Sequence, residues 1–73
     1  MNCAKLRGKR AELRLSQHEC GVLIGKGASS YSRKENGECE FTPAEICNFT
    51  IGTKLSFDEF NDIFFDGNLP FGE

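Results

Sequence analysis

The chain of 73 residues is poor in the side chains on which enzymes and metal sites usually depend. His18 is its single histidine, and neither a histidine-based catalytic triad nor a metal cluster assembles around it in the sequence. The cysteines include no C-x-x-C pair, so a zinc cage would need ligands from four separate places, Cys3, Cys20, Cys39 and Cys47. We therefore expect no enzyme, no metal and no cofactor, and reduced thiols in preference to zinc ligands or disulfides.

Long apolar runs and the alternating pattern of a β-strand are also missing. No run is long enough to cross a membrane and no signal peptide is recognised, so we expect no membrane partner and a cytoplasmic location. Period-two alternation never lasts long enough to predict a strand. The length leaves room for one domain with a small core, a size at which dimerisation often helps.

The charged residues that are present divide the chain into a basic half and an acidic half. Residues 1–37 hold eight Lys and Arg against three Glu, a net charge of +5, and residues 38–73 hold one Lys against eight acidic residues, a net charge of −7. All seven phenylalanines lie in the acidic half. We expect the first half to face a polyanion and the second half to make apolar contacts.

Three predicted helix starts share a hydroxyl residue followed three places later by glutamate. In this capping box the hydroxyl accepts a hydrogen bond from a first-turn backbone N–H, and the glutamate accepts one from the N–H of the cap. The pairs are Ser16 with Glu19, Thr42 with Glu45, and Ser56 with Glu59, and Pro43 suits the first helical position of the second. The pattern predicts an all-α domain with helices over 2–13, 17–24, 28–35, 43–51 and 57–65.

Glycines and apolar side chains refine this prediction. Gly25 and Gly52 are placed to end two helices in a left-handed residue, and Asn36-Gly37 to turn the chain after the third helix. We expect the following apolar and cysteine side chains to lie on the apolar sides of their helices and to pack in the core: Cys20, Ile24, Tyr31, Cys47, Phe57, Phe60 and Phe64.

The segment from Ser16 to Gly37 resembles the helix-turn-helix of the Cro and repressor family, which includes lambdoid phage repressors and xenobiotic-response-type regulators. The family pattern is matched in register and without gaps by Ser16-Gln17, Glu19, Leu23-Ile24, Gly25, Tyr31-Ser32 and Glu35-Asn36-Gly37. Residues 55–60, Leu-Ser-Phe-Asp-Glu-Phe, are similar to the family's closing helix start. The resemblance implies a compact five-helix lambda-repressor-like domain over 1–66, with the helix-turn-helix in its second and third helices, and a short tail over 67–73.

The resemblance also implies which residues contact DNA. Gln17 matches a glutamine that bonds a backbone phosphate in relatives, and Arg33 lies on the outward face of the recognition helix, where an arginine can bind guanine O6 and N7. Arg10 and Glu35 match a structural ion pair between the first helix and the end of the third. The whole implied DNA-binding set is Gln17, Lys26, Ala28, Ser29, Ser32, Arg33, Asn36 and Gly37.

We therefore expect a small transcriptional regulator of a phage or prophage, acting in the bacterial cytoplasm or in an infected host cell. It would insert its third helix into the major groove of double-stranded DNA as a homodimer, with an interface at Phe65, Leu69 and Phe71. Glu38 and Glu40 lie where phage repressors commonly carry basic residues. Most outward side chains of the recognition helix are small, and the chain holds more aromatic surface than so small a core can cover. Together with the two acids, these features leave two alternatives open: an antirepressor or other modulator of a partner repressor, and the antitoxin of a toxin–antitoxin pair.

Overall fold

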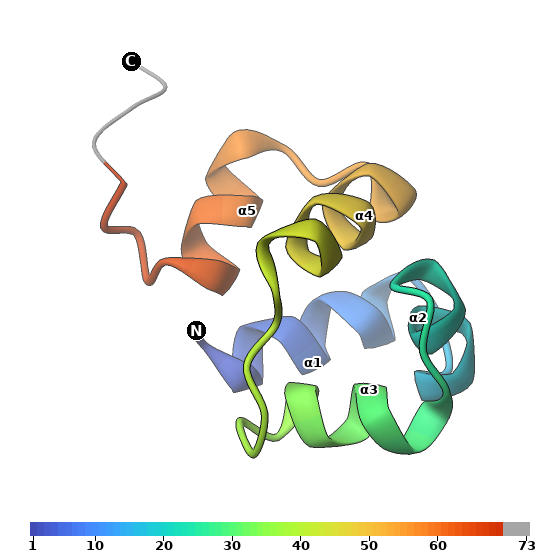
Figure 1. The fold of residues 1–73 in the computed structure, drawn as a ribbon. Coiled ribbons are helices and arrows are strands. Elements are labelled where there is room, and N and C mark those ends of the chain that lie inside the picture. Colours follow the sequence, from blue (N-terminus) through green and yellow to red (C-terminus); the bar gives the residue numbers. More distant parts are fainter. Residues whose placement is uncertain (70–73) are drawn as a thin grey trace.

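The computed structural model describes residues 1–69, which form five α-helices and, within that range, no strand (Figure 1). The all-α prediction is confirmed for these residues, and each predicted helix boundary agrees within two residues. The helices are α1 (Cys3–Glu12), α2 (Gln17–Leu23), α3 (Ala28–Glu35), α4 (Pro43–Thr53) and α5 (Phe57–Phe64).

All three predicted capping boxes are present, and they explain where α2, α4 and α5 begin. At the start of α2, the Glu19 N–H donates to the Ser16 hydroxyl at 3.0 Å, and the Ser16 N–H donates to the Glu19 carboxylate at 2.9 Å. The same reciprocal bonds form at the starts of α4 and α5. Each box satisfies two backbone donors that would otherwise lack a partner at the helix end.

The predicted end of α4 at Gly52 is wrong. Gly25 does adopt a left-handed conformation after α2, with φ of +74°, but α4 continues through Gly52 to Thr53, and the left-handed residue is Lys54, with φ of +56°. Thr53 is buried, and its hydroxyl donates to the Phe49 carbonyl at 2.7 Å. Burial of Thr53 therefore extends the helix two residues beyond its predicted end at Ile51.

The core is built from side chains of all five helices and of the turn after α2. Tyr31 stacks near Phe49, with ring centroids 6.4 Å apart, and Phe64 meets Phe49 edge-on at 5.9 Å. Ile24 and Tyr31 are buried, as predicted. The complete buried apolar set is Leu6, Cys20, Ile24, Tyr31, Phe49, Ile63 and Phe64.

The two cysteines predicted to lie on apolar helix faces differ in burial. Cys20 is buried, as predicted, but Cys47 is exposed, so that assignment is wrong. The buried face of α4 is formed by Glu45, Phe49 and Thr53, which are spaced by four residues. Cys47 lies two residues from Phe49 and therefore projects from the opposite side of the helix.

The predicted aromatic stripe of α5 enters the core only in part. Phe64 is buried and Phe60 packs half-buried against the core, but Phe57 keeps 38% of its surface exposed. Phe65 is also half-buried, with its ring centroid 5.2 Å from that of Phe60. Phe57 is the first residue of α5, and only the later turns of this helix reach the centre of the core.

Candidate nucleic-acid interface

The candidate site lies on the outer side of α2 and α3, which meet across the turn over 24–27 (Figure 1). Five of the eight residues predicted to bind DNA line one surface depression: Gln17, Ala28, Ser29, Ser32 and Arg33. Lys26 is exposed in the turn before α3, and Asn36 and Gly37 are exposed in the turn after it. The fold therefore gathers the predicted residues along α3, at its two ends and at the start of α2.

A close backbone approach sets the angle between α2 and α3. The Lys26 N–H donates to the Gly21 carbonyl at 2.7 Å. A Cβ on Gly21 would lie 2.8 Å from the carbonyl oxygens of both Lys26 and Gly27. Because this distance is shorter than normal van der Waals contact, only glycine allows the turn to pack against α2 in this position.

A buried ion pair joins α1 to the end of α3. Arg10 donates to the Glu35 carboxylate twice, from Nε at 2.7 Å and from Nη2 at 3.1 Å, and its Nη1 donates to the Leu15 carbonyl at 3.1 Å. Burial alone would raise the pKa of the Glu35 carboxyl, but interactions with Arg10, Tyr31 and Gln17 together outweigh it, so that pKa lies below its ordinary value. The ion pair holds the last turn of α3 against α1.

The same carboxylate connects to the exposed side of the site through Gln17. The Gln17 amide Nε2 donates to the Ser32 hydroxyl at 3.3 Å and lies 3.5 Å from Glu35 Oε1. Gln17 and Ser32, both predicted to contact DNA, therefore touch each other and are held by the Arg10–Glu35 pair. Sequence reasoning missed this connection, because it depends on the angle between two helices and not on local spacing.

Ion pairs within the chain neutralise much of the charge contrast seen in the sequence. Within residues 1–69, four acidic residues of the second half pair with cations of the first half, the amino terminus included. Four exposed basic residues of the first half have no ion-pair partner among these residues: Arg7, Arg14, Lys26 and Arg33, called here the exposed cations. A polyanion would meet these four first.

Two of the exposed cations, Arg7 and Arg14, were not among the predicted site residues. Arg7 shares one side of α1 with Cys3 and Arg10, because positions 3, 7 and 10 fall along one helix face, and Arg14 lies beyond the end of α1 in a left-handed conformation, with φ of +59°. Arg10 binds Glu35 at the end of α3, and the Cys3 sulfur lies 3.5 Å from where a Cβ on Gly37 would be. This side of α1 therefore borders the carboxyl end of α3. The helical spacing of Cys3, Arg7 and Arg10 in the sequence could have identified Arg7 as a neighbour of the site.

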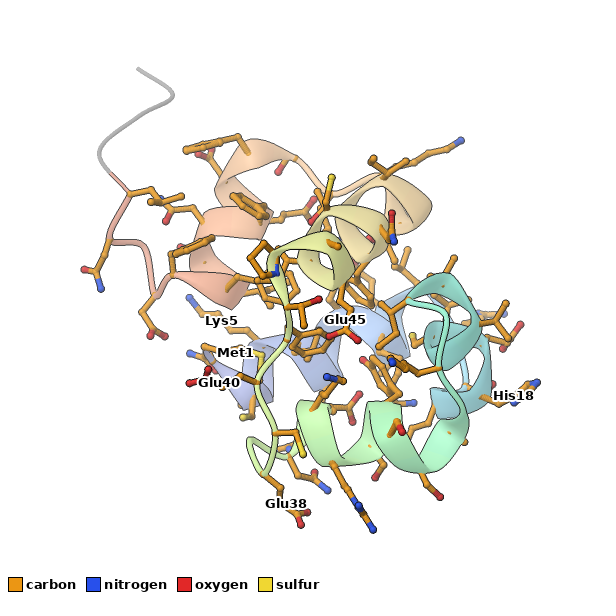
Figure 2. The ribbon with its side chains drawn as sticks, viewed as in Figure 1. Met1, Lys5, His18, Glu38, Glu40 and Glu45 are labelled. Carbon is orange, nitrogen blue, oxygen red and sulfur yellow. The ribbon has the colours of Figure 1, made fainter. Side chains whose placement is uncertain are left out.

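The loop after α3 brings negative charge to the edge of the site. Figure 2 shows Glu38 pointing outward from this loop, away from the helices. Glu40 is also exposed, and Lys34 does not offset it, because its ammonium is bound to the Glu45 carboxylate at 2.9 Å and to the Glu40 carbonyl at 3.0 Å. His18 is exposed on the outer side of α2 (Figure 2).

Comparison with known proteins gives no significant match to a protein-family model, a curated protein or a solved structure. Within residues 1–69, no three His, Cys, Asp or Glu side chains gather where they would hold a metal ion. No helix in the same range is long and apolar enough to cross a membrane.

Proposed function

We propose that the protein is a DNA-binding transcriptional regulator of the Cro and repressor type. In this proposal α2, the turn and α3 form a lambda-repressor-like helix-turn-helix, and α3 enters the major groove. The observation that carries the proposal is the depression that Gln17 shares with Ser29, Ser32 and Arg33. Its lining joins hydroxyl and guanidinium groups of α3 with the amide of Gln17 at the start of α2, and these groups are complementary to phosphates and base edges.

The roles within the site follow from its geometry. Arg33 is exposed and has no carboxylate partner among residues 1–69, so its guanidinium is available for guanine O6 and N7; such a contact discriminates by about 1–3 kcal/mol. Ser29 and Ser32 offer hydroxyls, and the Ala28 methyl suits the methyl group of thymine. Gln17, held by Ser32, would reach the phosphate at the rim of the groove.

Phosphate contacts would come from the ends of the site. Lys26 precedes α3, the Asn36-Gly37 turn follows it, Arg7 lies on the bordering side of α1, and Arg14 is exposed just after the end of α1. Three basic side chains on phosphates would give a slope of about −3 for log K against log salt concentration per protomer.

Fluorescence anisotropy on labelled duplexes tests this proposal. We expect wild-type protein to bind at low salt and to weaken with the slope given above. Arg33→Gln should flatten the preference among duplexes, whereas Lys5→Gln, which removes an exposed charge on the side of α1 that pairs with Asp62 of α5, should leave binding unchanged. Arg7→Gln should reduce the slope by about 1. Absence of salt-dependent binding at low salt, or an unchanged preference in Arg33→Gln, would reject it.

We also propose that the protein binds DNA as a homodimer. An apolar groove of about 560 Å³ lies between α4 and α5 and is lined mainly by Phe41, Ile46, Ile51, Leu55, Phe57 and Phe60. Ile51 is 69% exposed. Lys54 and Asp58 are exposed near the groove with opposite charges, so a two-fold arrangement can bring each one to the other in the second copy.

The three predicted interface residues stand differently toward this groove. Phe65 lines it. Leu69 is held within the chain, because its N–H and carbonyl both bond to the Asn61 side chain, at 3.0 and 3.2 Å. Phe71 lies outside the described residues. The proposed interface is therefore centred on α4 and α5 and includes Phe65.

Sedimentation velocity tests the dimer with two matched variants. Ile51→Lys places a charge in the groove, and Val22→Lys places the same charge on α2, at a side chain that is 63% exposed and does not line the groove. We expect wild type and Val22→Lys to sediment as dimers and Ile51→Lys as a monomer. A monomeric wild type, or a dimeric Ile51→Lys, would contradict the assignment.

The acidic loop favours a second candidate function. Glu38 exposes its carboxylate just after α3, Glu40 is exposed near Met1 (Figure 2), and Lys34 is bound within the chain. A modulator that docks on a partner regulator, as an antirepressor or an antitoxin does with its own partner, would tolerate this charge better than a DNA reader would. An antirepressor would bind no duplex at low salt and would form a complex with a co-purified partner, whereas an antitoxin would bind both DNA and its partner.

A further inference from the structure

Two of the four cysteines line the same cavity. It has a volume of about 370 Å³, and Cys3 and Cys39 both contribute to its walls, together with Gly37 and Phe41. Cys3 is the first residue of α1, and Cys39 lies in the loop after α3. The Cys3 sulfur is 3.5 Å from the position of a Cβ on Gly37, two residues before Cys39. Two thiols from distant parts of the sequence therefore face one small space.

The other two cysteines lack this arrangement. Cys20 is buried in the core, so dissolved reagents do not reach its sulfur. Desolvation also raises the pKa of its thiol, which lowers the fraction of reactive thiolate. Cys47 is exposed, but it lines the groove between α4 and α5, to which no other cysteine of residues 1–69 contributes. Within the described residues, Cys3 and Cys39 are the pair that shares a cavity.

We propose that Cys3 and Cys39 are a site of reversible oxidation, which a low-molecular-weight disulfide such as oxidised glutathione closes into an intramolecular disulfide. One cysteine thiolate attacks a sulfur of the reagent, breaks its S–S bond and releases one small thiol. The second cysteine thiolate then attacks the mixed disulfide and releases the other small thiol. Both cysteines have lost their protons and are oxidised, and the reagent is reduced to two thiols.

The bond would link the start of α1 to the backbone that ends α3. The N–H groups of Glu38 and Cys39 both donate to the Arg33 carbonyl, at 2.9 and 3.3 Å. A link at Cys39 therefore restrains the end of the helix that carries Arg33. It also restricts the unfolded chain over residues 3–39, and we expect a rise in Tm of roughly 15 °C if the native geometry accepts the bond.

Intact mass and thermal unfolding of the full chain test the site. After reduction and exposure to oxidised glutathione, Cys47→Ser should lose about 2 Da, through two hydrogens, and wild type should show the same loss together with a glutathione adduct on the exposed Cys47. Cys3→Ser and Cys39→Ser should instead keep a glutathione adduct on the remaining thiol. Cleavage after Glu40 and Glu45 separates Cys39 from Cys47 and identifies the linked peptides.

Several results would overturn the proposal. They are stable glutathione adducts on both Cys3 and Cys39 of wild type, a Cys39–Cys47 link, disulfide-linked dimers as the main product, or a Cys3–Cys39 bond that lowers Tm. The mass and Tm measurements need no DNA, so the oxidation site and the DNA-binding proposal succeed or fail separately.

Discussion

Replacing Gly21 with alanine would test the contact that sets the angle between α2 and α3. The new Cβ would lie 2.8 Å from two backbone oxygens, those of Lys26 and Gly27, and 3.0 Å from the Gly27 carbonyl carbon. Backbone atoms cannot rotate away as a side-chain end can, so the turn must shift. Overpacking of this kind costs about 1–3 kcal/mol, against a gain of up to about 1 kcal/mol in helix propensity. We expect a net loss of about 1–2 kcal/mol and a Tm lower by roughly 5–15 °C.

Two other glycines provide the controls, measured by thermal and urea unfolding with far-ultraviolet circular dichroism. Gly8 is exposed in α1, and nothing described lies within 4 Å of its Cβ position, so Gly8→Ala should raise stability by about 0.5–1 kcal/mol. A Cβ on Gly52 would lie 2.7 Å from Leu23 Cδ2, the end of a flexible side chain, so Gly52→Ala should fall between the other two. A Gly21→Ala protein as stable as Gly8→Ala would refute the reasoning.

Two further predictions concern the ion pair and the helix caps. Burial raises the pKa of Glu35, but interactions with Arg10, Tyr31 and Gln17 together outweigh it and depress that pKa in the folded protein. The stabilising effect of the Glu35 carboxylate is therefore full above its unfolded pKa of about 4.3 and is lost as pH falls through the folded value. The difference in unfolding free energy between wild type and Glu35→Gln, about 3 kcal/mol at neutral pH, should therefore shrink toward about pH 3 in urea titrations; a constant difference would contradict the assigned partner. Thr42→Ala removes the hydroxyl of a capping box and should cost about 1 kcal/mol, with faster amide exchange in the first turn of α4. Unchanged exchange at Glu45 would show that the cap does not hold this turn.

The helices could be predicted from the sequence because their starts are local. A capping box needs residues only three positions apart, and all three predicted boxes form. The errors arose where tertiary contacts decide. Gly52 did not end α4, because burial of Thr53 carried the helix on, and Cys47 is exposed, because Phe49 fixed which side of α4 faces the core.

The candidate site was predictable as a set of residues but not as a set of contacts. Spacing on one helix places Ser29, Ser32 and Arg33 together, and the structure keeps them in one depression. The bond between Gln17 and Ser32 joins residues 15 positions apart and depends on the packing of α2 against α3. The charge contrast between the two halves also had to be revised, because ion pairs across the fold neutralise four cations of the first half, the amino terminus included, and leave the exposed cations without a partner among residues 1–69.

Mapping amide chemical shifts during titration with duplex DNA tests DNA recognition through α3 most directly. At low salt we expect the largest changes at Gln17, along α3 from Ala28 to Arg33, and at the Asn36-Gly37 turn. The groove between α4 and α5 should change little, and the changes should reverse when salt is added. Shifts confined to that groove, or no shifts at any duplex concentration, would contradict DNA recognition through α3.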